Sequence, residues 1–129
     1  MLNAVATAEK TVLVVDDDPT TREFVQEVLS PHHYRVLWAQ DGLEAVQWTR
    51  RSHIDLILMD VRMPLFSGFW FCQAFKHKKN TSNIPIVIMS GLLDEENTEK
   101  ARRAGACATM KKPFNHEELL EIVEKNAIH

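Results

Sequence analysis

Five charged or hydroxyl side chains stand where short apolar runs of this 129-residue sequence end. Asp16 and Asp17 follow TVLVV, and Asp60 follows DLILM. Ser90 closes IPIVIMS, and Lys112 follows ACATMK. Carboxylates, a hydroxyl and a lysine are groups that bind divalent cations and phosphate. Their recurrence at the ends of apolar runs therefore indicates metal or phosphate chemistry.

Three carboxylates gathered at one place would repel one another. Two unit charges about 5 Å apart cost roughly 3 kcal/mol at an effective dielectric constant near 20. Lys112 can supply one compensating charge, and a bound divalent cation can supply the rest. Oxygen ligands suit Mg²⁺. A carboxylate beside Mg²⁺, a lysine and a hydroxyl is equipped for phosphoryl transfer, in which the carboxylate attacks and the cations offset the charge of the transferring oxygens.

These side chains would meet at one edge of a sheet if the apolar runs form parallel strands. The runs lie at 11–16, 34–39, 55–60, 84–90 and 106–111, and segments with helical spacing separate them. VLVV and LILM are apolar on both faces, as is typical of parallel strands covered by helices on both sides. The sequence therefore predicts a doubly wound α/β fold with five parallel strands and five helices. Sites in such sheets form beyond the carboxyl ends of the strands.

The predicted helices carry recognisable start signals and inner faces. Asp18 can cap the first helix with Pro19 at its first position, and Asn115 with Glu118 forms a capping box for the last. The second helix is expected at about 41–51, the third after Ser67–Gly68, and the fourth, mostly polar, near 95–104. The side chains expected to turn inward are Phe24, Val25, Val28 and Leu29; Leu43, Ala45 and Val46; Phe71, Cys72 and Phe75; Ala101 and Ala104; and Leu119, Leu120 and Val123. One of Phe69, Trp70 and Phe71 must face outward, which leaves room for a small contact patch.

Length and composition indicate one domain, residues 11–129, after a loose N-terminal tail, residues 1–10, with no second domain expected. The formal net charge of −3 argues against nucleic-acid binding, which needs clustered basic residues. No apolar run reaches the roughly 18 residues that span a bilayer, and no signal peptide is visible, so a cytoplasmic protein without membrane contact is expected. Cys72 and Cys107 are expected to be reduced thiols.

In this order and spacing, VLVVDDDP, LILMDVRMP, IVIMSG and MKKPF resemble the signature of the response-regulator receiver family of two-component signalling, over roughly residues 11–126. The resemblance implies a flavodoxin-like sheet with strand order 2-1-3-4-5, as in chemotaxis regulators. It also implies a phosphoacceptor switch of a phosphorelay, which takes a phosphoryl group from a histidine kinase or a histidine phosphotransfer protein. Such a protein is not an enzyme beyond promoting its own Mg²⁺-dependent phosphorylation and dephosphorylation.

The resemblance assigns roles by matching position. Asp60 would be the phosphoacceptor, Ser90 would hydrogen-bond a phosphoryl oxygen, and Lys112 rather than Lys111 would pair with the phosphoryl group. The implied metal site consists of Asp16, which would orient a metal-bound water, and the ligands Asp17, Asp60 and the backbone carbonyl of Arg62. Pro64 and Gly68 match the family's loop after the acceptor strand.

Thr109 departs from the family, which usually carries an aromatic residue three positions before the lysine. The signal is therefore expected to pass through the fourth helix and the loop before it. The expected output surface consists of the fourth helix, the fifth strand and the fifth helix. The output partner that binds it is unidentified. Homodimerisation on activation also stays open. Arg62 and Leu92 occupy positions that influence the lifetime of the phosphoryl group in this family.

Three other functions share parts of this pattern. A phosphatase of the haloacid dehalogenase type needs a second aspartate where Arg62 stands. A flavin-binding module needs a phosphate cradle after the first strand, where DDD would repel phosphate. The alternative that stays open is a degenerate receiver acting only as a protein-interaction module, although all five site residues are present.

Overall fold

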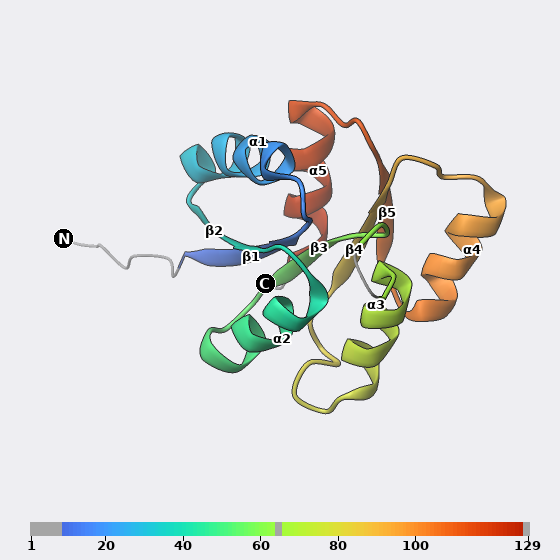
Figure 1. Cartoon of the computed structure of the whole chain (residues 1–129). Coiled ribbons are helices and arrows are strands. Elements are labelled where there is room, and N and C mark those ends of the chain that lie inside the picture. The colour runs from blue at the N-terminus through green and yellow to red at the C-terminus, as the bar shows by residue number, and fades with distance from the viewer. Residues whose placement is uncertain (1–8, 64–65, 128–129) are drawn as a thin grey trace.

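The computed structural model describes residues 9–63 and 66–127, which form a five-stranded parallel sheet between two layers of helices (Figure 1). The strands are β1 (Lys10–Val15), β2 (Tyr34–Ala39), β3 (Leu56–Asp60), β4 (Ile86–Ser90) and β5 (Ala108–Lys111). The helices are α1 (Pro19–Leu29), α2 (Gly42–Arg51), α3 (Gly68–His77), α4 (Glu95–Ala104) and α5 (His116–Asn126), with a short 3₁₀ turn η1 (Ser30–His32) after α1. The strand order β2-β1-β3-β4-β5 confirms the predicted fold.

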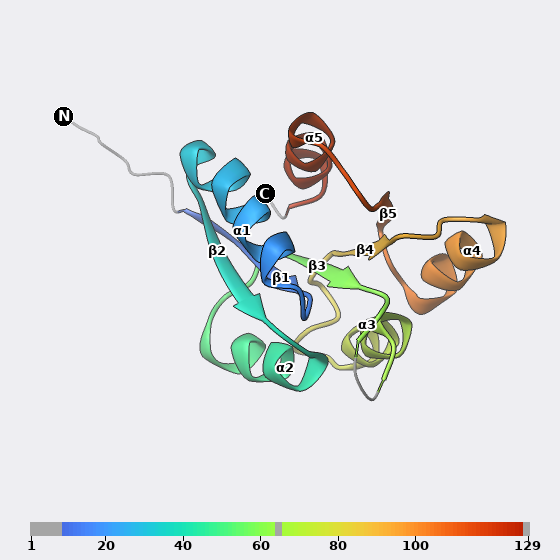
Figure 2. The same ribbon diagram turned by 45° about the horizontal axis from the view of Figure 1, so that its top comes forward.

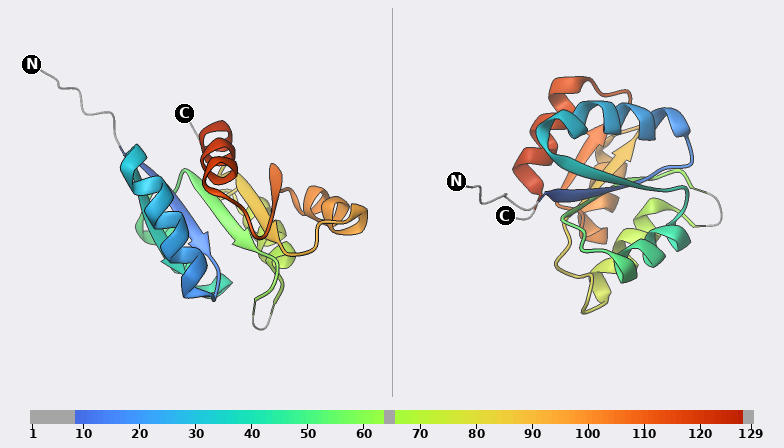
Figure 3. Two further views of the ribbon diagram at one scale, coloured as in Figure 1. Left: turned by 90° about the horizontal axis from the view of Figure 1, so that it is seen from above. Right: turned by 90° about the vertical axis from the view of Figure 1, so that its left-hand side faces the viewer.

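Two helices cover one face of the sheet and three cover the other. Figures 2 and 3 show α1 and α5 together on one side and α2 and α3 on the other, and α4 packs beside α3. The alternation of side chains along β1 follows from this sandwich. Leu13 and Val15 pack in the core under α2, α3 and α4, whereas Val12 and Val14 pack in the core under α1 and α5. Every residue of β3 and β4 is buried, as expected of central parallel strands.

The helix start signals were predicted correctly. The Asp18 side chain accepts a hydrogen bond from the backbone N–H of Thr20 at 2.9 Å, and Pro19 begins α1. Asn115 and Glu118 form the reciprocal hydrogen bonds of a capping box at α5. β1 begins one residue earlier than expected, at Lys10. Residues 1–8 of the predicted tail, Pro64 of the predicted loop and residues 128–129 lie outside the described residues.

The prediction that Leu43 faces inward was wrong, because its side chain is 58% exposed. The reason is a close approach of α2 to α3: a Cβ atom at Gly42 would lie 2.3 Å from the Phe71 ring. The inner face of α2 is therefore set by Gly42 and Ala45, and Leu43 turns away. Leu120 is only half-buried, whereas its neighbours Leu119 and Val123 are fully buried as predicted.

None of the helices within the described residues is long and apolar enough to cross a membrane.

Gly68 places α3 directly against the end of β3, and this contact yields a stability prediction. A Cβ atom at Gly68 would lie 2.1 Å from the backbone oxygen of Asp60, whereas a Cβ atom at Gly91 would meet nothing within 4 Å. We expect Gly68→Ala to lower the free energy of unfolding by about 1–3 kcal/mol, because backbone cannot yield as a flexible side chain does. Gly91→Ala is the matched control and should change it by less than about 0.5 kcal/mol. Urea denaturation followed by circular dichroism measures both, and equal stabilities would contradict the close approach.

Candidate functional site

The three predicted carboxylates meet at the carboxyl end of the sheet. Asp16 and Asp17 follow β1, and Asp60 ends β3, which pairs with β1. One side-chain oxygen of each lies within 4.8 Å of those of the other two. Asp16 and Asp60 are buried, with 1% and 5% of their surface exposed, whereas Asp17 is exposed. Two buried acidic groups therefore share this place with one that faces solvent.

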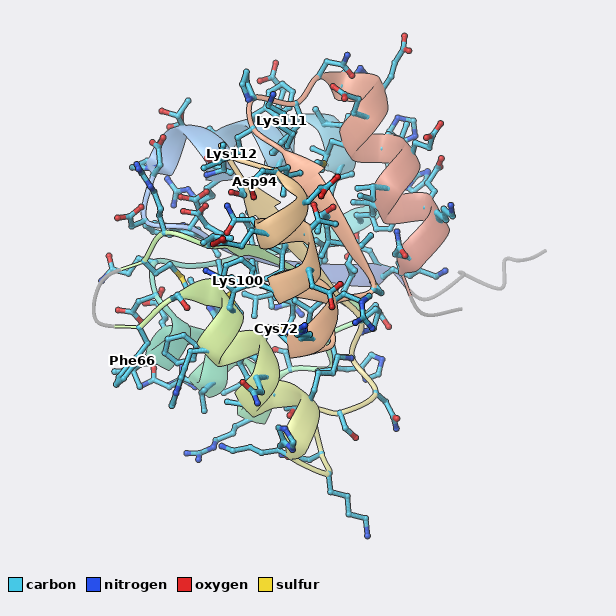
Figure 4. All side chains as sticks on the ribbon, turned by 90° about the vertical axis from the view of Figure 1, so that its right-hand side faces the viewer. Phe66, Cys72, Asp94, Lys100, Lys111 and Lys112 are labelled. Atoms are coloured by element: carbon cyan, nitrogen blue, oxygen red, sulfur yellow. The ribbon has the colours of Figure 1, made fainter. Side chains whose placement is uncertain are left out.

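Lys112 supplies the positive charge that this cluster needs. Its Nζ lies 2.5 Å from Asp16 Oδ2 and 3.4 Å from Asp60 Oδ1, and its side chain is 24% exposed. Its backbone N–H donates to the Ser90 carbonyl at 2.8 Å, which fixes the chain just beyond β5. Lys111 is exposed, and no ion pair joins it to a carboxylate in the described part of the chain. The two lysines lie near each other at the end of β5 (Figure 4), but Lys112 alone reaches the acidic cluster.

Asp60 is held in an environment that disfavours its charged form. Burial raises its pKa to about 6, the negative charge of Asp16 adds to the rise, and Lys112 and a backbone hydrogen bond from Arg62 oppose it. Burial alone would lower the pKa of Lys112, but the hydrogen bond to Asp16 and the charges of both aspartates raise it. Lys112 therefore stays charged. Any further positive charge that enters the cluster would favour the ionised form of Asp60.

The backbone around Asp16 is fixed from the side of β2. The indole Nε1 of Trp38 donates to the Asp16 carbonyl at 2.8 Å, and the Asp16 N–H donates to the Ala39 carbonyl at 3.0 Å. One Asp16 carboxylate oxygen accepts from the Asp18 N–H at 3.0 Å. The sequence did not indicate a role for Trp38, because an indole in a strand predicts core packing and gives no sign of its hydrogen-bond partner.

Ser90 lies at the predicted place, at the end of β4, but its hydroxyl is engaged by the following loop. The hydroxyl donates to the Leu92 carbonyl at 2.9 Å and accepts from the Leu92 N–H at 3.1 Å. The Asn97 side chain of α4 donates to the same Leu92 carbonyl at 3.1 Å. The loop between β4 and α4 is thus tied to Ser90 at one end and to α4 at the other. Asn97 had no signal in the sequence, because an amide in the first turn of a helix is common.

Two open cavities flank the acceptor carboxylate. One, of about 550 Å³, is lined by residues that include Asp60, Ser90, Asn97 and Lys112. The other, of about 540 Å³, is lined by residues that include Asp16, Asp17, Asp60 and Phe66. Arg62 borders both cavities. A small anionic group could therefore reach Asp60 from solvent with Lys112 beside it.

The Lys112 contacts predict an effect on stability that Lys111 does not share. We expect Lys112→Ala to lower the free energy of unfolding by about 2–3 kcal/mol, because removal of one partner leaves Asp16 buried without its counter-charge. This lies below the roughly 3–5 kcal/mol of a fully buried pair, since Lys112 is partly exposed. Lys111→Ala should stay within about 0.5 kcal/mol of the unchanged protein. Urea titrations of both variants without metal measure the difference, and equal losses would show that both lysines support the site.

Comparison with known sequences identifies the family. Residues 12–124 match the sequence profile described as response regulator receiver domain. The chain is 36% identical over 109 residues to hybrid signal transduction histidine kinase D of Dictyostelium discoideum, covering 84% of this chain and 7% of that kinase. It is 36% identical over 108 residues to the transcriptional regulatory protein YrkP of Bacillus subtilis, covering 84% of this chain and 45% of YrkP. It therefore spans less than half the length of these two relatives. With protein PilH of Pseudomonas aeruginosa it shares 32% identity over 112 residues, covering 87% of this chain and 93% of PilH.

Solved structures agree with this result. Chemotaxis protein CheY4 of Vibrio cholerae superposes with a TM-score of 0.87 at 32% identity, over 92% of this chain and 99% of that one. The receiver domain of sensor histidine kinase PA1611 from Pseudomonas aeruginosa superposes with a TM-score of 0.82 at 28% identity, over 92% of this chain and 98% of that one. That second structure has a magnesium ion coordinated in its active-site cleft.

Proposed function

The chain belongs to the response regulator receiver family of two-component signalling, and we propose that it is a switch whose phosphoacceptor is Asp60. Receiver domains are regulatory switches rather than classical enzymes. The observation that supports Asp60 as acceptor is its position: a buried carboxylate close to Asp16 and Lys112, bordered by two open cavities. We further propose that residues 11–129 act as one domain.

The chain's own groups suit the transfer of a phosphoryl group. The Asp60 carboxylate attacks phosphorus, and the leaving group departs from the opposite side. Lys112 lies 3.4 Å from Asp60 and can pair with a phosphoryl oxygen once Asp60 has given up its own charge. The Ser90 hydroxyl borders the same cavity and can donate to another phosphoryl oxygen. Each of these groups belongs to the end of a strand, so the sheet holds them in place.

The acidic cluster fits Mg²⁺. Its three carboxylates offer oxygen atoms within 4.8 Å of one another, and hard oxygen ligands are what this ion prefers. In our proposal Asp17, Asp60 and the Arg62 carbonyl would hold the ion, and Asp16 would orient a water beside it. When bound, the ion would offset the negative charge of the carboxylates and of the incoming phosphoryl oxygens.

A small phosphodonor tests the proposed chemistry. Incubation with acetyl phosphate and Mg²⁺ should add one labile phosphoryl group to the protein, and chelation of the metal should prevent the addition. Intact-protein mass spectrometry measures the adduct. A protein that stays unmodified under these conditions would favour the alternative, a degenerate receiver that acts only as a protein-interaction module.

The loop after β4 is the part of the chain that can transmit the phosphorylation of Asp60 to α4. A phosphoryl oxygen on Asp60 would compete with the Leu92 carbonyl for the Ser90 hydroxyl. The Leu92 carbonyl would then keep only its bond from Asn97, so the start of α4 would be free to shift with the loop. The buried side chains of α4 are only Ala101 and Ala104. A shift of this helix therefore disrupts few buried contacts and costs little free energy.

We therefore expect beryllofluoride, a phosphoryl analogue, to produce its largest amide shifts in residues 90–105, with smaller ones at Thr109. Some of the shifted form should exist before activation, because the analogue shifts a population between two conformations. Two-dimensional NMR with and without beryllofluoride measures the shifts. Ser90→Ala is the informative variant, since it can bind the analogue without pulling the loop. Shifts confined to residues that touch the analogue, in the unchanged protein, would contradict this account.

The partners follow from the same proposal. The donor would be the phosphohistidine of a histidine kinase or of a histidine phosphotransfer protein. The output surface would be the face of α4, β5 and α5, where a groove of about 350 Å³ runs along β5 and α5 past Thr109 and Glu121. An output protein or a second activated copy of the chain could occupy that face.

A further inference from the structure

Two aromatic side chains outside the core stack on each other beside the acidic cleft. Phe66 is 46% exposed and Trp70 is 50% exposed, and their ring centroids lie 4.5 Å apart with 21° between the planes. Trp70 in turn makes an edge-to-face contact with Phe71, with ring centroids 5.0 Å apart, and Phe71 is 5% exposed. The exposed pair therefore packs against the core through Phe71. The outward ring expected at the start of α3 is Trp70, and it stacks on Phe66.

Phe66, one member of this pair, lies in the wall of the cleft that leads to the acceptor. Phe66 lines the same cavity as Asp16, Asp17, Asp18 and Asp60. In Figure 4 Phe66 lies beside the beginning of α3, below and to the left of Asp94 at the start of α4. A group that approaches Asp60 through this cavity passes three carboxylates and one aromatic ring.

We propose that Phe66, braced by Trp70, receives the imidazole ring of a phosphohistidine donor while Asp60 attacks. The inference rests on the proposed function and adds to it a residue that selects among donors. Phe66 is here a specificity-determining residue, since it touches the leaving group and takes no part in the bonds that change.

The chemistry of the donor explains why a ring at this place matters. The P–O bond to Asp60 forms as the P–N bond breaks, and the ring nitrogen keeps the electron pair of the broken bond. A ring protonated at its other nitrogen thus leaves as neutral imidazole. Until then the ring carries positive charge, which an aromatic face and the nearby carboxylate of Asp18 attract. The leaving group departs on the side away from Asp60, towards the mouth of the cleft.

Exposed apolar side chains elsewhere do not offer this chemistry. Leu92, 62% exposed, borders the cavity on the side of α4, but it has no π face. Leu43, 58% exposed, lines neither of the two cavities beside Asp60. Among the described residues, Phe66 is thus the exposed aromatic side chain that lines a cavity beside the acceptor.

The test compares three small donors on four proteins. Phosphoimidazole has a P–N bond and a ring, phosphoramidate has a P–N bond without a ring, and acetyl phosphate has neither. The proteins are the unchanged chain, Phe66→Ala, Phe66→Tyr and the control Leu43→Ala, all with Mg²⁺. Intact-protein mass spectrometry gives the initial rate of phosphorylation for each combination.

We expect Phe66→Ala to lose about two- to fivefold in rate with phosphoimidazole, the size of a cation–π contact at an exposed site. Its rates with phosphoramidate and acetyl phosphate should not change. Phe66→Tyr keeps the ring and should keep the rate, and Leu43→Ala should match the unchanged chain with every donor. Equal losses of Phe66→Ala with all three donors, or no loss with phosphoimidazole, would overturn the inference. If the unchanged chain accepts no phosphoryl group from any donor, the proposed function itself fails.

Discussion

Replacing Asp60 by asparagine is expected to leave the protein without any acyl phosphate after incubation with acetyl phosphate and Mg²⁺. Asparagine has nearly the shape of aspartate, but its amide is not a nucleophile, so the acceptor is removed with little change in packing. The variant should still fold, because the substitution takes away a buried negative charge that Asp16 and burial both disfavour. Intact-protein mass spectrometry compares the two proteins under the same conditions.

The identity of the acceptor depends on this comparison. A labile adduct that persists at the same level in Asp60→Asn would mean that Asp16, Asp17 or another group accepts the phosphoryl group. Circular dichroism of Asp60→Asn provides the control, since a native spectrum excludes loss of phosphorylation through unfolding.

The second large effect is expected at the metal site. Asp17→Asn should abolish Mg²⁺-dependent phosphorylation, because it removes an exposed carboxylate of the three-membered cluster. It should also abolish the rise in melting temperature that Mg²⁺ gives the unchanged protein, since a ligand that binds only the folded state stabilises that state. Without metal, Asp17→Asn should be as stable as the unchanged protein or slightly more so, because one like charge has gone.

Asp18→Asn is the matched control for this experiment. Asp18 is the next residue and lines the same cavity, but its side chain caps α1 and does not belong to the three-membered cluster. Asparagine caps a helix as well as aspartate does. The control should therefore keep most of the Mg²⁺-induced rise in melting temperature. Equal responses of both variants would contradict the assignment of Asp17, and a markedly less stable Asp17→Asn in metal-free buffer would contradict the argument from repulsion.

Much of the site could be predicted from the sequence, because its residues come at the ends of strands. Once the apolar runs are parallel strands, Asp16, Asp60 and Ser90 must lie along one edge of the sheet. The resemblance to receivers selects Lys112 rather than Lys111 by its place before Pro113, and in the structure Lys112 contacts Asp16. The caps at Asp18 and Asn115 were predictable because capping depends on residues next to each other in the chain.

The rest depends on contacts between elements that are far apart in the sequence. Leu43 was misplaced because the approach of Gly42 to Phe71 decides which side of α2 faces the core. The Ser90 hydroxyl is predicted to hydrogen-bond a phosphoryl oxygen. No sequence pattern indicates that this hydroxyl donates to the Leu92 carbonyl, as it does in this structure. Phe66 was not singled out, because only the fold stacks it on Trp70 at the wall of the cleft.

Borohydride trapping tests the central claim most directly. Borohydride reduces an acyl phosphate to an alcohol and so converts a phosphorylated aspartate into homoserine, which survives digestion and sequencing by tandem mass spectrometry. After reaction with acetyl phosphate and Mg²⁺, we expect homoserine at position 60 and at no other aspartate. Homoserine at position 16 or 17, or none at position 60 in a protein that carries the phosphoryl adduct, would show that Asp60 is not the acceptor.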